Sequence, residues 1–329
     1  MSTDAISHCE VPITFLCGHI LHKRRTYHSP TMQLPSAPIF PPGPVPPYPS
    51  DNAPVPFGSI SNGNNNNPKT RQLNAVMLPT PDTSHVPYQR VYEPAEDSFL
   101  LLDTLSSPSE TAFLSTRFAS PSPSSASPAP LVLEVGPGSG VVIAFLTAHA
   151  STIFGTPHIL TTAIDVSPFA CAATNLTVPK AVSENPSTSG VWTSAIQGDL
   201  VSPFRPGSVE ILVFNPPYVP TPDLPAPPPT GLQQLKEKTT FEEDSHLLDL
   251  TYAGGRDGME TTDRLIEALP GVLSERGVAY ILLCAQNKPE EVKERIRAMG
   301  SEGKWKAETV GTSGKQAGWE KLQIVRVWR

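Results

Sequence analysis

The sequence has few cysteines, no excess of positive charge and no long apolar run, and each absence excludes a class of protein. The 4 cysteines among 329 residues are widely scattered, so they make no disulfide framework and favour a reducing compartment. The net charge of -7 argues against a general nucleic-acid-binding surface. No apolar run reaches the roughly 20 residues that a membrane-spanning helix needs. The composition therefore predicts a protein that does not span a membrane and makes nucleic acid an improbable partner.

A small group of potential metal ligands lies near the start of the chain. Cys9, Cys17, His19 and His22 are close together in sequence, which raises the question of a zinc site. Their spacing fits no established zinc finger, and the flanking residues are not built like one. We therefore predict no metal site.

Proline, by contrast, is abundant, with 39 residues that are unevenly placed. From about Pro30 to Pro87 the chain is rich in proline, serine and asparagine, and such a segment has too little apolar surface to offset the entropy of ordering it. We predict that residues 1–86 are a disordered tail and that residues 87–329 form one α/β domain. Met77 is an alternative start, which would make residues 1–76 a dispensable tail or a gene-model extension. Two low-complexity stretches in the domain, 106–130 and 220–229, are predicted surface loops.

The domain has a strand, a glycine turn and a helix in succession. The apolar run Leu131–Val135 is followed by Gly136-Pro137-Gly138-Ser139-Gly140 and then by the apolar segment Val141–Ala150. Glycines allow positive φ and close backbone approach, and a helix N-terminus offers free N–H groups. In this setting the glycine turn is a good candidate for a nucleotide site.

Two further strands end near acidic residues. His158–Asp165 is a predicted strand whose last residue stands where nucleotide-binding α/β folds hold ribose hydroxyls. Asp165 as the N-cap of the next helix is an alternative that is compatible with this role. Val191–Ile196 is a predicted third strand, and Asp199 after it stands where a side chain can meet an adenine edge.

The tetrapeptide Asn215-Pro216-Pro217-Tyr218 directly follows the apolar run Val209–Phe214. Neither proline can donate to a β-ladder, so the strand ends there and Asn215 is delivered to its carboxyl end. The Asn215 side-chain oxygen and the Pro216 carbonyl can accept both hydrogens of an NH2 group, and Tyr218 can cover its face. The alternative is a plain loop that ends a strand.

The remaining elements are predicted from helical or strand patterns and from turn residues. The cluster between Tyr252 and Gly258 is either a plain turn or a substrate-side loop. One helix is predicted to begin near Pro94, and three more are predicted at 168–176, 262–273 and 289–299. A strand is predicted at 278–283, and an antiparallel pair of strands at 305–310 and 322–328. We expect the charged helix 289–299 to present a solvated face.

Taken together, these motifs resemble those of the HemK-type glutamine methyltransferases, which are class I S-adenosylmethionine enzymes, and in particular the eukaryotic branch that modifies a translation termination factor. The resemblance covers nearly all of residues 87–329 and none of 1–76. It is carried by VYEPAEDSFLLLD from Val91, LEVGPGSGVV from Leu131, the aspartates 165 and 199, FNPPYV from Phe214, YAGGRDGME from Tyr252 and QAGWEKL from Gln316.

The resemblance implies a Rossmann-like sheet of about seven strands, mostly parallel, with helices on both faces. It implies S-adenosylmethionine as cofactor, and as substrate the glutamine of the Gly-Gly-Gln motif in the class I peptide release factor. A small zinc-binding activator subunit would pair with the edge strand near Val191–Ile196. The implied location is cytoplasmic, or also nuclear.

The resemblance also assigns roles to residues. Asn215, Pro216 and Tyr218 would be catalytic. Cofactor binding would involve Glu134, Gly136, Gly138, Asp165, Asp199, Leu200, Asn215 and Ser98, and substrate binding would involve Glu93, Asp97, Asn215, Pro217 and Tyr218. The family loop usually has Trp where Tyr252 stands.

Three other functions fit parts of the pattern. Adenine N6 methylation of nucleic acid suits the same tetrapeptide, because an exocyclic NH2 on a flat ring resembles an amide. Lysine methylation of a histone or another protein fits less well, since an ammonium group is not planar. A cofactor-binding scaffold without activity is a further alternative, although the glycine, aspartate and Asn-Pro-Pro-Tyr positions are intact.

Overall fold

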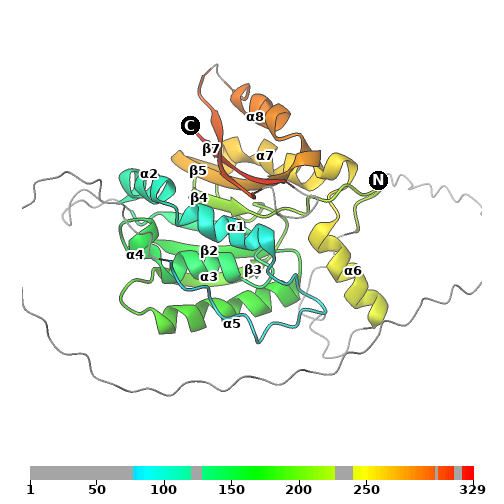
Figure 1. The fold of residues 1–329 in the computed structure, drawn as a ribbon, viewed down its shortest axis with the longest axis horizontal. Helices are drawn as coiled ribbons and strands as arrows, with labels where there is room; N and C mark the ends of the chain where they lie inside the picture. The colour runs from blue at the N-terminus through cyan, green and yellow to red at the C-terminus, as the bar shows by residue number, and fades with distance from the viewer. Residues whose placement is uncertain (1–76, 120–127, 227–239, 301–302, 315–320) are drawn as a thin grey trace, which may run out of the picture. The chain divides into compact units, whose positions relative to one another are not determined.

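The computed structural model describes residues 77–119, 128–226, 240–300, 303–314 and 321–329. These residues form a seven-stranded sheet with the strand order β3-β2-β1-β4-β5-β7-β6 (Figure 1). The strands are β1 Leu131–Val135, β2 Leu160–Asp165, β3 Val191–Gln197, β4 Val209–Phe214, β5 Leu273–Cys284, β6 Lys306–Thr312 and β7 Leu322–Trp328. Strands β1 to β5 pair in parallel, and β7 is antiparallel to both β5 and β6. The predicted class I methyltransferase sheet is therefore confirmed.

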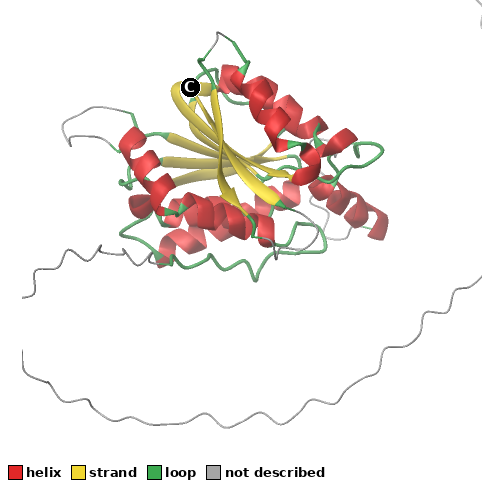
Figure 2. Ribbon diagram, turned by 45° about the horizontal axis from the view of Figure 1, so that its top comes forward, coloured by secondary structure: helices red, strands yellow, loops and turns green. Residues whose placement is uncertain are grey.

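The central strands are apolar on both faces because helices cover both sides of the sheet (Figure 2). Ile211 and Val213 of β4 belong to one buried cluster, whereas Leu212 and Phe214 belong to the other. The first cluster includes side chains of α1 Glu96–Leu105, α2 Pro108–Phe118, α3 Val141–Ala148, α4 Ala150–Ile153 and α5 Pro168–Glu184. The second includes side chains of α7 Glu260–Val272 and α8 Pro289–Arg297.

The prediction of a loop over 106–130 is wrong for residues 108–118, which form α2. The Ser107 side chain accepts a hydrogen bond from the Glu110 backbone N–H at 3.4 Å, and Pro108 occupies the first turn, where its missing N–H costs nothing. Glu110 is buried and bonds Arg326 and the Tyr280 hydroxyl, which ties α2 to the sheet. The helix start signal of Ser107 and Pro108 therefore decided the local structure, although the Ser/Pro-rich composition of the stretch favours a loop.

Helix α6 Phe241–Tyr252 was not predicted, although it begins with a capping box. The Thr240 side chain accepts from the Glu243 N–H at 3.2 Å, and the Glu243 carboxylate accepts from the Thr240 N–H at 2.8 Å. The helix ends at Tyr252, directly before the glycine cluster.

Two other helices differ from their predictions in extent or setting. Helix α5 continues to Glu184 through Pro179 instead of ending at Leu176. Helix α8 is amphipathic rather than only a solvated face, because Val292 and Ile296 are buried against the sheet. No helix among the described residues is long and apolar enough to cross a membrane.

Some predictions concern residues outside the described ranges. These are the tail up to residue 76 with its cysteine–histidine group, positions 120–127 and 227–229 of the two proposed loops, and Gln316–Glu320 of the last motif. Residues 77–86, which were predicted to be part of the tail, do lie within the described ranges. There Val86 is buried, and the His149 side chain contacts the Pro79 carbonyl oxygen at 3.0 Å.

Candidate active site

A cavity of about 650 Å³ lies where strands β1, β2 and β4 end. The strand order reverses between β1 and β4, and open α/β sheets bind ligands in the crevice at such a switch point. The predicted site residues that line the cavity are Asp97, Ser98, Glu134, Gly136, Gly138, Asp165, Asp199, Leu200, Asn215, Pro216, Pro217 and Tyr218. The fold thus brings twelve of the thirteen together. Glu93 is exposed and is not among the lining residues, so its role stays a prediction.

The glycine turn has the backbone conformation that its composition predicts. Gly136 and Gly138 have φ values of +64° and +53°, a region that side chains other than glycine rarely adopt. Gly140 also has a positive φ, of +80°, and a Cβ there would in addition lie 2.9 Å from the Thr174 Cα of α5. The turn brings its backbone to the cavity wall and leads directly into α3, with Gly140 at the N-cap.

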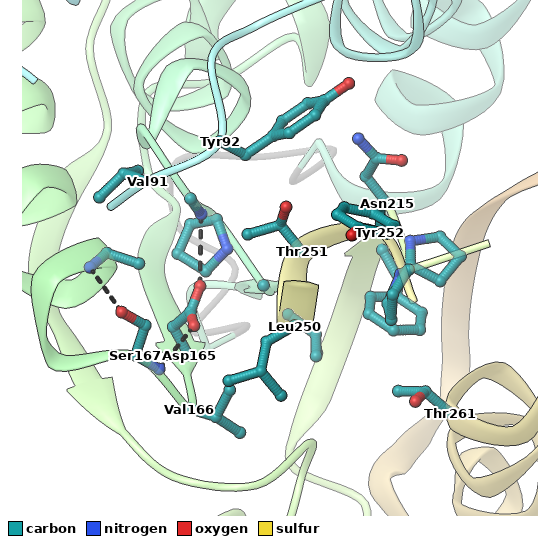
Figure 3. Close-up of a pocket in the computed structure, with 18 of the residues that line it drawn as sticks. Val91, Tyr92, Asp165, Val166, Ser167, Asn215, Leu250, Thr251, Tyr252 and Thr261 are labelled. Atoms are coloured by element: carbon teal, nitrogen blue, oxygen red, sulfur yellow. Dashed lines mark hydrogen bonds between the residues drawn. The ribbon is translucent and has the colours of Figure 1, made fainter. Parts of the chain in front are cut away.

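Two carboxyl groups with raised pKa values stand beside this turn. Glu134, on β1, is 2% exposed, and its carboxylate accepts the Ile143 N–H at 2.8 Å. Burial raises the pKa of Glu134 to about 8, and the nearby charge of Asp165 adds to the shift. Burial also raises the pKa of Asp165 to about 6, against the opposing effect of hydrogen bonds from the Ser167 and Gly138 N–H groups. Those bonds, of 2.8 and 3.3 Å, orient the Asp165 carboxylate (Figure 3).

Asp199 and Leu200 follow β3 and also line the cavity. The Asp199 carboxylate forms an ion pair with Arg264 of α7, which also lines the cavity. Both side chains are about half exposed, so the pair is open to water and contributes little to stability. Its effect is to hold an acceptor at the position predicted to meet an adenine edge.

The tetrapeptide after β4 presents an unsatisfied acceptor. The Asn215 Oδ1 atom is buried and has no hydrogen-bond partner among the residues that the structure describes. A buried oxygen in this state costs about 1–3 kcal/mol, so a ligand N–H that reaches it gains that energy back. Tyr218 also lines the cavity, and its hydroxyl lies 3.5 Å from the Asp97 carboxylate.

Asp97 connects the start of α1 with the tetrapeptide. Its carboxylate accepts the Tyr92 hydroxyl at 2.9 Å and the Ser98 hydroxyl at 3.2 Å, in addition to the contact with Tyr218. Asp97 and Ser98 are both buried. The start of α1 therefore lines one side of the cavity, and Asp97 helps to position the Tyr218 ring.

Several lining residues were not predicted from the sequence. Tyr92 comes from the segment before α1, Arg264 from α7, and Leu247, Leu250 and Thr251 from α6. In Figure 3, Asp165, Val166 and Ser167 lie to one side of Thr251, whereas Asn215 and Tyr252 lie to the other. The Arg90 side chain holds α6 through a 2.9 Å ion pair with Asp244. The capping box at Thr240 was a usable signal for α6, but its contact with the cavity was not visible in the sequence.

These groups fit S-adenosylmethionine. The oriented Asp165 carboxylate suits ribose hydroxyl donors, Asp199 suits an exocyclic amino group, and the glycine turn leaves room for a chain to lie against the backbone. The carboxylates of Asp165 and Asp199 also suit a cofactor that carries a positive sulfonium. The sheet order and this donor set define an S-adenosylmethionine-dependent class I methyltransferase.

The comparisons with known proteins define the family. The chain is 34% identical over 259 residues to "Methyltransferase HEMK2" of Mus musculus, covering 77% of this chain and 97% of that protein. It is 31% identical over 257 residues to the "eRF1 methyltransferase catalytic subunit mtq2" of Schizosaccharomyces pombe, covering 77% and 96% of the two chains. A "Release factor glutamine methyltransferase" of Deinococcus radiodurans is 28% identical over 179 residues and is covered over 52% of its length. The chain belongs to the HemK-type methyltransferase family.

No family model matches the chain. A solved precorrin-6y C5,15-methyltransferase from Geobacter metallireducens covers 67% of this chain and is covered over 87% of its own length, with 10% identity and a TM-score of 0.36. The fold assignment rests on the strand order described above.

Proposed function

We propose that this enzyme transfers a methyl group from S-adenosylmethionine to the side-chain amide nitrogen of the glutamine in the Gly-Gly-Gln motif of the class I release factor. The observation that carries the proposal is the Asn215 Oδ1 atom, which is buried at the cavity wall without a partner among the described residues. The relatives named for release-factor and eRF1 methylation point to the same substrate.

A primary amide fits this acceptor because its nitrogen carries two N–H donors in one plane. The Asn215 side-chain oxygen would accept one of them, and the carbonyl of Pro216 would accept the other. Tyr218 would pack on the flat face of the amide. Since Pro216 and Pro217 carry no N–H, the tetrapeptide puts few competing donors beside the substrate nitrogen.

The amide nitrogen is a poor nucleophile because its lone pair is delocalised into the carbonyl. S-adenosylmethionine, which Asp165, Asp199 and the glycine turn would hold, would supply an electrophilic methyl group on a positive sulfur. Asn215, Pro216 and Tyr218 would hold the amide nitrogen in line with that methyl group, at the roughly 3–3.5 Å of a near-attack arrangement. Acceptors on both N–H bonds favour the positive charge that develops on nitrogen, and one amide proton leaves late, to water. This mechanism requires no cysteine, histidine or metal.

We also propose that a small zinc-binding activator subunit pairs with β3. This strand ends the sheet order, and Val191 on it is 58% exposed, so an apolar edge is available for another chain. We expect the isolated chain to be poorly soluble and co-expression with the activator to rescue it. Val191→Lys should weaken co-purification, whereas a fully active and stable monomer would contradict the proposal.

Methyl transfer from labelled cofactor tests the substrate. The enzyme, with and without the activator, is offered release factor with the Gly-Gly-Gln glutamine intact or changed to alanine, beside adenine-containing DNA and histone. Label on the intact factor alone supports the proposal. Label on DNA would favour adenine methylation, and label on histone or on the altered factor would favour another protein residue. Cofactor binding without any label would favour a scaffold.

A further inference from the structure

Asn287 follows β5 and is 2% exposed, although nothing in the sequence marks it as a site residue. Its side-chain amide donates to three backbone carbonyl oxygens, those of Tyr218 at 3.0 Å, Asp257 at 2.9 Å and Gly258 at 3.3 Å. Its side-chain oxygen accepts the Cys284 N–H at 2.8 Å. One buried side chain therefore joins the end of β5, the glycine cluster before α7 and the Asn-Pro-Pro-Tyr tetrapeptide.

The glycine cluster lies directly against that tetrapeptide. A Cβ at Gly254 would overlap the Pro217 carbonyl oxygen, and one at Gly258 would overlap the Tyr218 carbonyl oxygen. The Val219 N–H donates to the Tyr252 carbonyl at 2.9 Å, and the Gly254 N–H donates back to the Val219 carbonyl at 2.8 Å. The two segments thus pack as a short parallel pair with no side chain between them.

The tetrapeptide depends on such outside contacts. Pro216 and Pro217 have no N–H, so the backbone between β4 and Tyr218 has fewer donors with which to anchor itself. Asp257, whose carbonyl Asn287 also binds, has φ +56°, which is uncommon for a residue with a side chain. A donor fixed between the Tyr218 and Asp257 carbonyls holds both segments in one arrangement.

We propose that Asn287 is a positioning residue for methyl transfer: its amide fixes the Tyr218 backbone and thereby sets where the Asn215 oxygen and the Pro216 carbonyl stand. This inference rests on the proposed function, since it concerns the same amide-binding turn. Asn287 is not among the residues that line the cavity, so it acts through the turn and not on the substrate. Displacement of a reacting group by 1 Å can cost about 100-fold in rate, even when the altered residue is distant.

Asn287→Asp is the informative substitution because it keeps the size of the side chain and removes the donors. An ionised carboxylate is only an acceptor, and it would face three carbonyl oxygens. We expect kcat on the release factor to fall about tenfold or more. The dissociation constant of S-adenosylmethionine should stay within about twofold, because Glu134, Asp165 and Asp199 lie on other segments. Asn287→Ala should likewise lower kcat and leave the dissociation constant of S-adenosylmethionine nearly unchanged.

Asn185→Asp is a matched control. Asn185 ends α5, and its side-chain amide also donates to a backbone carbonyl, that of Ala181 at 2.9 Å. The Asn185→Asp variant should retain the wild-type kcat. In each variant kcat is expressed per cofactor-binding site, counted by calorimetric titration, so that a misfolded fraction does not enter the rate.

The outcomes separate this inference from the proposed function. No transfer to the release factor by the wild-type enzyme with its activator would refute the proposed function. Transfer by the wild type together with an unchanged kcat per site in both Asn287 variants would refute the positioning role alone. Equal losses of kcat and cofactor affinity, or two variants that bind no cofactor, would make Asn287 a general structural residue and would also overturn the inference.

Discussion

The two halves of the cavity are built in different ways. In the cofactor half, Asp165 and Glu134 bond to N–H groups of their own or neighbouring segments, 9 residues away for Ile143 and 27 for Gly138. In the amide half, the Asn215 oxygen has no partner among the described residues, and the turn behind it is held by Asn287, which lies 69 residues after Tyr218. Glu134 and Asp165 are thus held by segments nearby in sequence, although Asp199 of the same half pairs with Arg264, 65 residues away. The turn in the other half is held by a segment further along the chain, and under the proposed function the Asn215 oxygen is the acceptor for the substrate.

The largest expected effect is that of Asn215→Ala. Removal of a positioned hydrogen-bonding group from the transition state costs about 10²–10³-fold in kcat, because the amide then lacks an acceptor for its developing charge. The cofactor dissociation constant should change by less than about threefold, because Glu134, Asp165 and Asp199 remain in place to bind the cofactor. Steady-state kinetics with release factor and titration with cofactor measure the two quantities. Equal losses in both would remove the distinction between the halves.

Asp165→Ala should have the converse effect. Loss of a charged hydrogen-bond acceptor costs about 1.5–3 kcal/mol, which corresponds to a rise of roughly 10- to 100-fold in the cofactor dissociation constant. The rate at saturating cofactor should fall much less. Calorimetric titration checks the affinity. A variant that binds cofactor normally would show that Asp165 only caps α5.

Gly258→Ala tests the close contact behind the amide half. The new Cβ would overlap the Tyr218 carbonyl oxygen, and φ is +67°, so a loss of about 1–3 kcal/mol in unfolding free energy is expected together with a lower kcat. Gly271→Ala in α7 is the control, since a Cβ there meets nothing within 4 Å. It should stabilise the protein by about 0.5–1 kcal/mol. Denaturant titration compares them, and similar effects at both positions would exclude the predicted contact.

The smallest effect is a pH dependence from the cofactor half. The pKa of Glu134 is about 8 in the folded protein and 4.5 without burial, so between these values the folded chain keeps a proton that the unfolded chain has released. The cofactor-free protein should therefore lose stability as pH rises through this window, by at most roughly 1.4 kcal/mol per pH unit. The pKa of Asp165 is about 6, so the loss of stability that its deprotonation causes is nearly complete by pH 7.

Denaturant titrations at pH 6.5, 7.0 and 7.5 isolate the Glu134 contribution. Glu134→Gln should flatten the slope in this range, because the amide does not titrate. Asn215→Ala, in the other half, should leave the slope unchanged. If the slope of unfolding free energy against pH persists in Glu134→Gln, the proton that is lost in this range belongs to another group.

Much of the fold was predictable because strands such as β1 and β4 are short apolar runs followed by glycine or proline. The glycine turn after β1 and the acids after β2 and β3 are visible as local patterns, and so is the Asn-Pro-Pro-Tyr tetrapeptide. Helix α2 was missed because serine and proline dominate its neighbourhood, although Ser107 and Pro108 are themselves start signals. Asn287 carried no signal, since a polar residue after a strand reads as an ordinary turn.

The amino-acid sequence by itself determined the order of the strands along the chain, the chemistry at the end of each one and the family to which the chain belongs. These features follow from local periodicity, from the missing N–H of proline and from the freedom of glycine at positive φ. Only the tertiary structure decided that Arg264 meets Asp199, that α6 walls the cavity and that Asn287 binds the backbone of the Asn-Pro-Pro-Tyr turn. Such contacts join residues far apart in sequence, and they form only when the buried faces of the sheet bring those segments together.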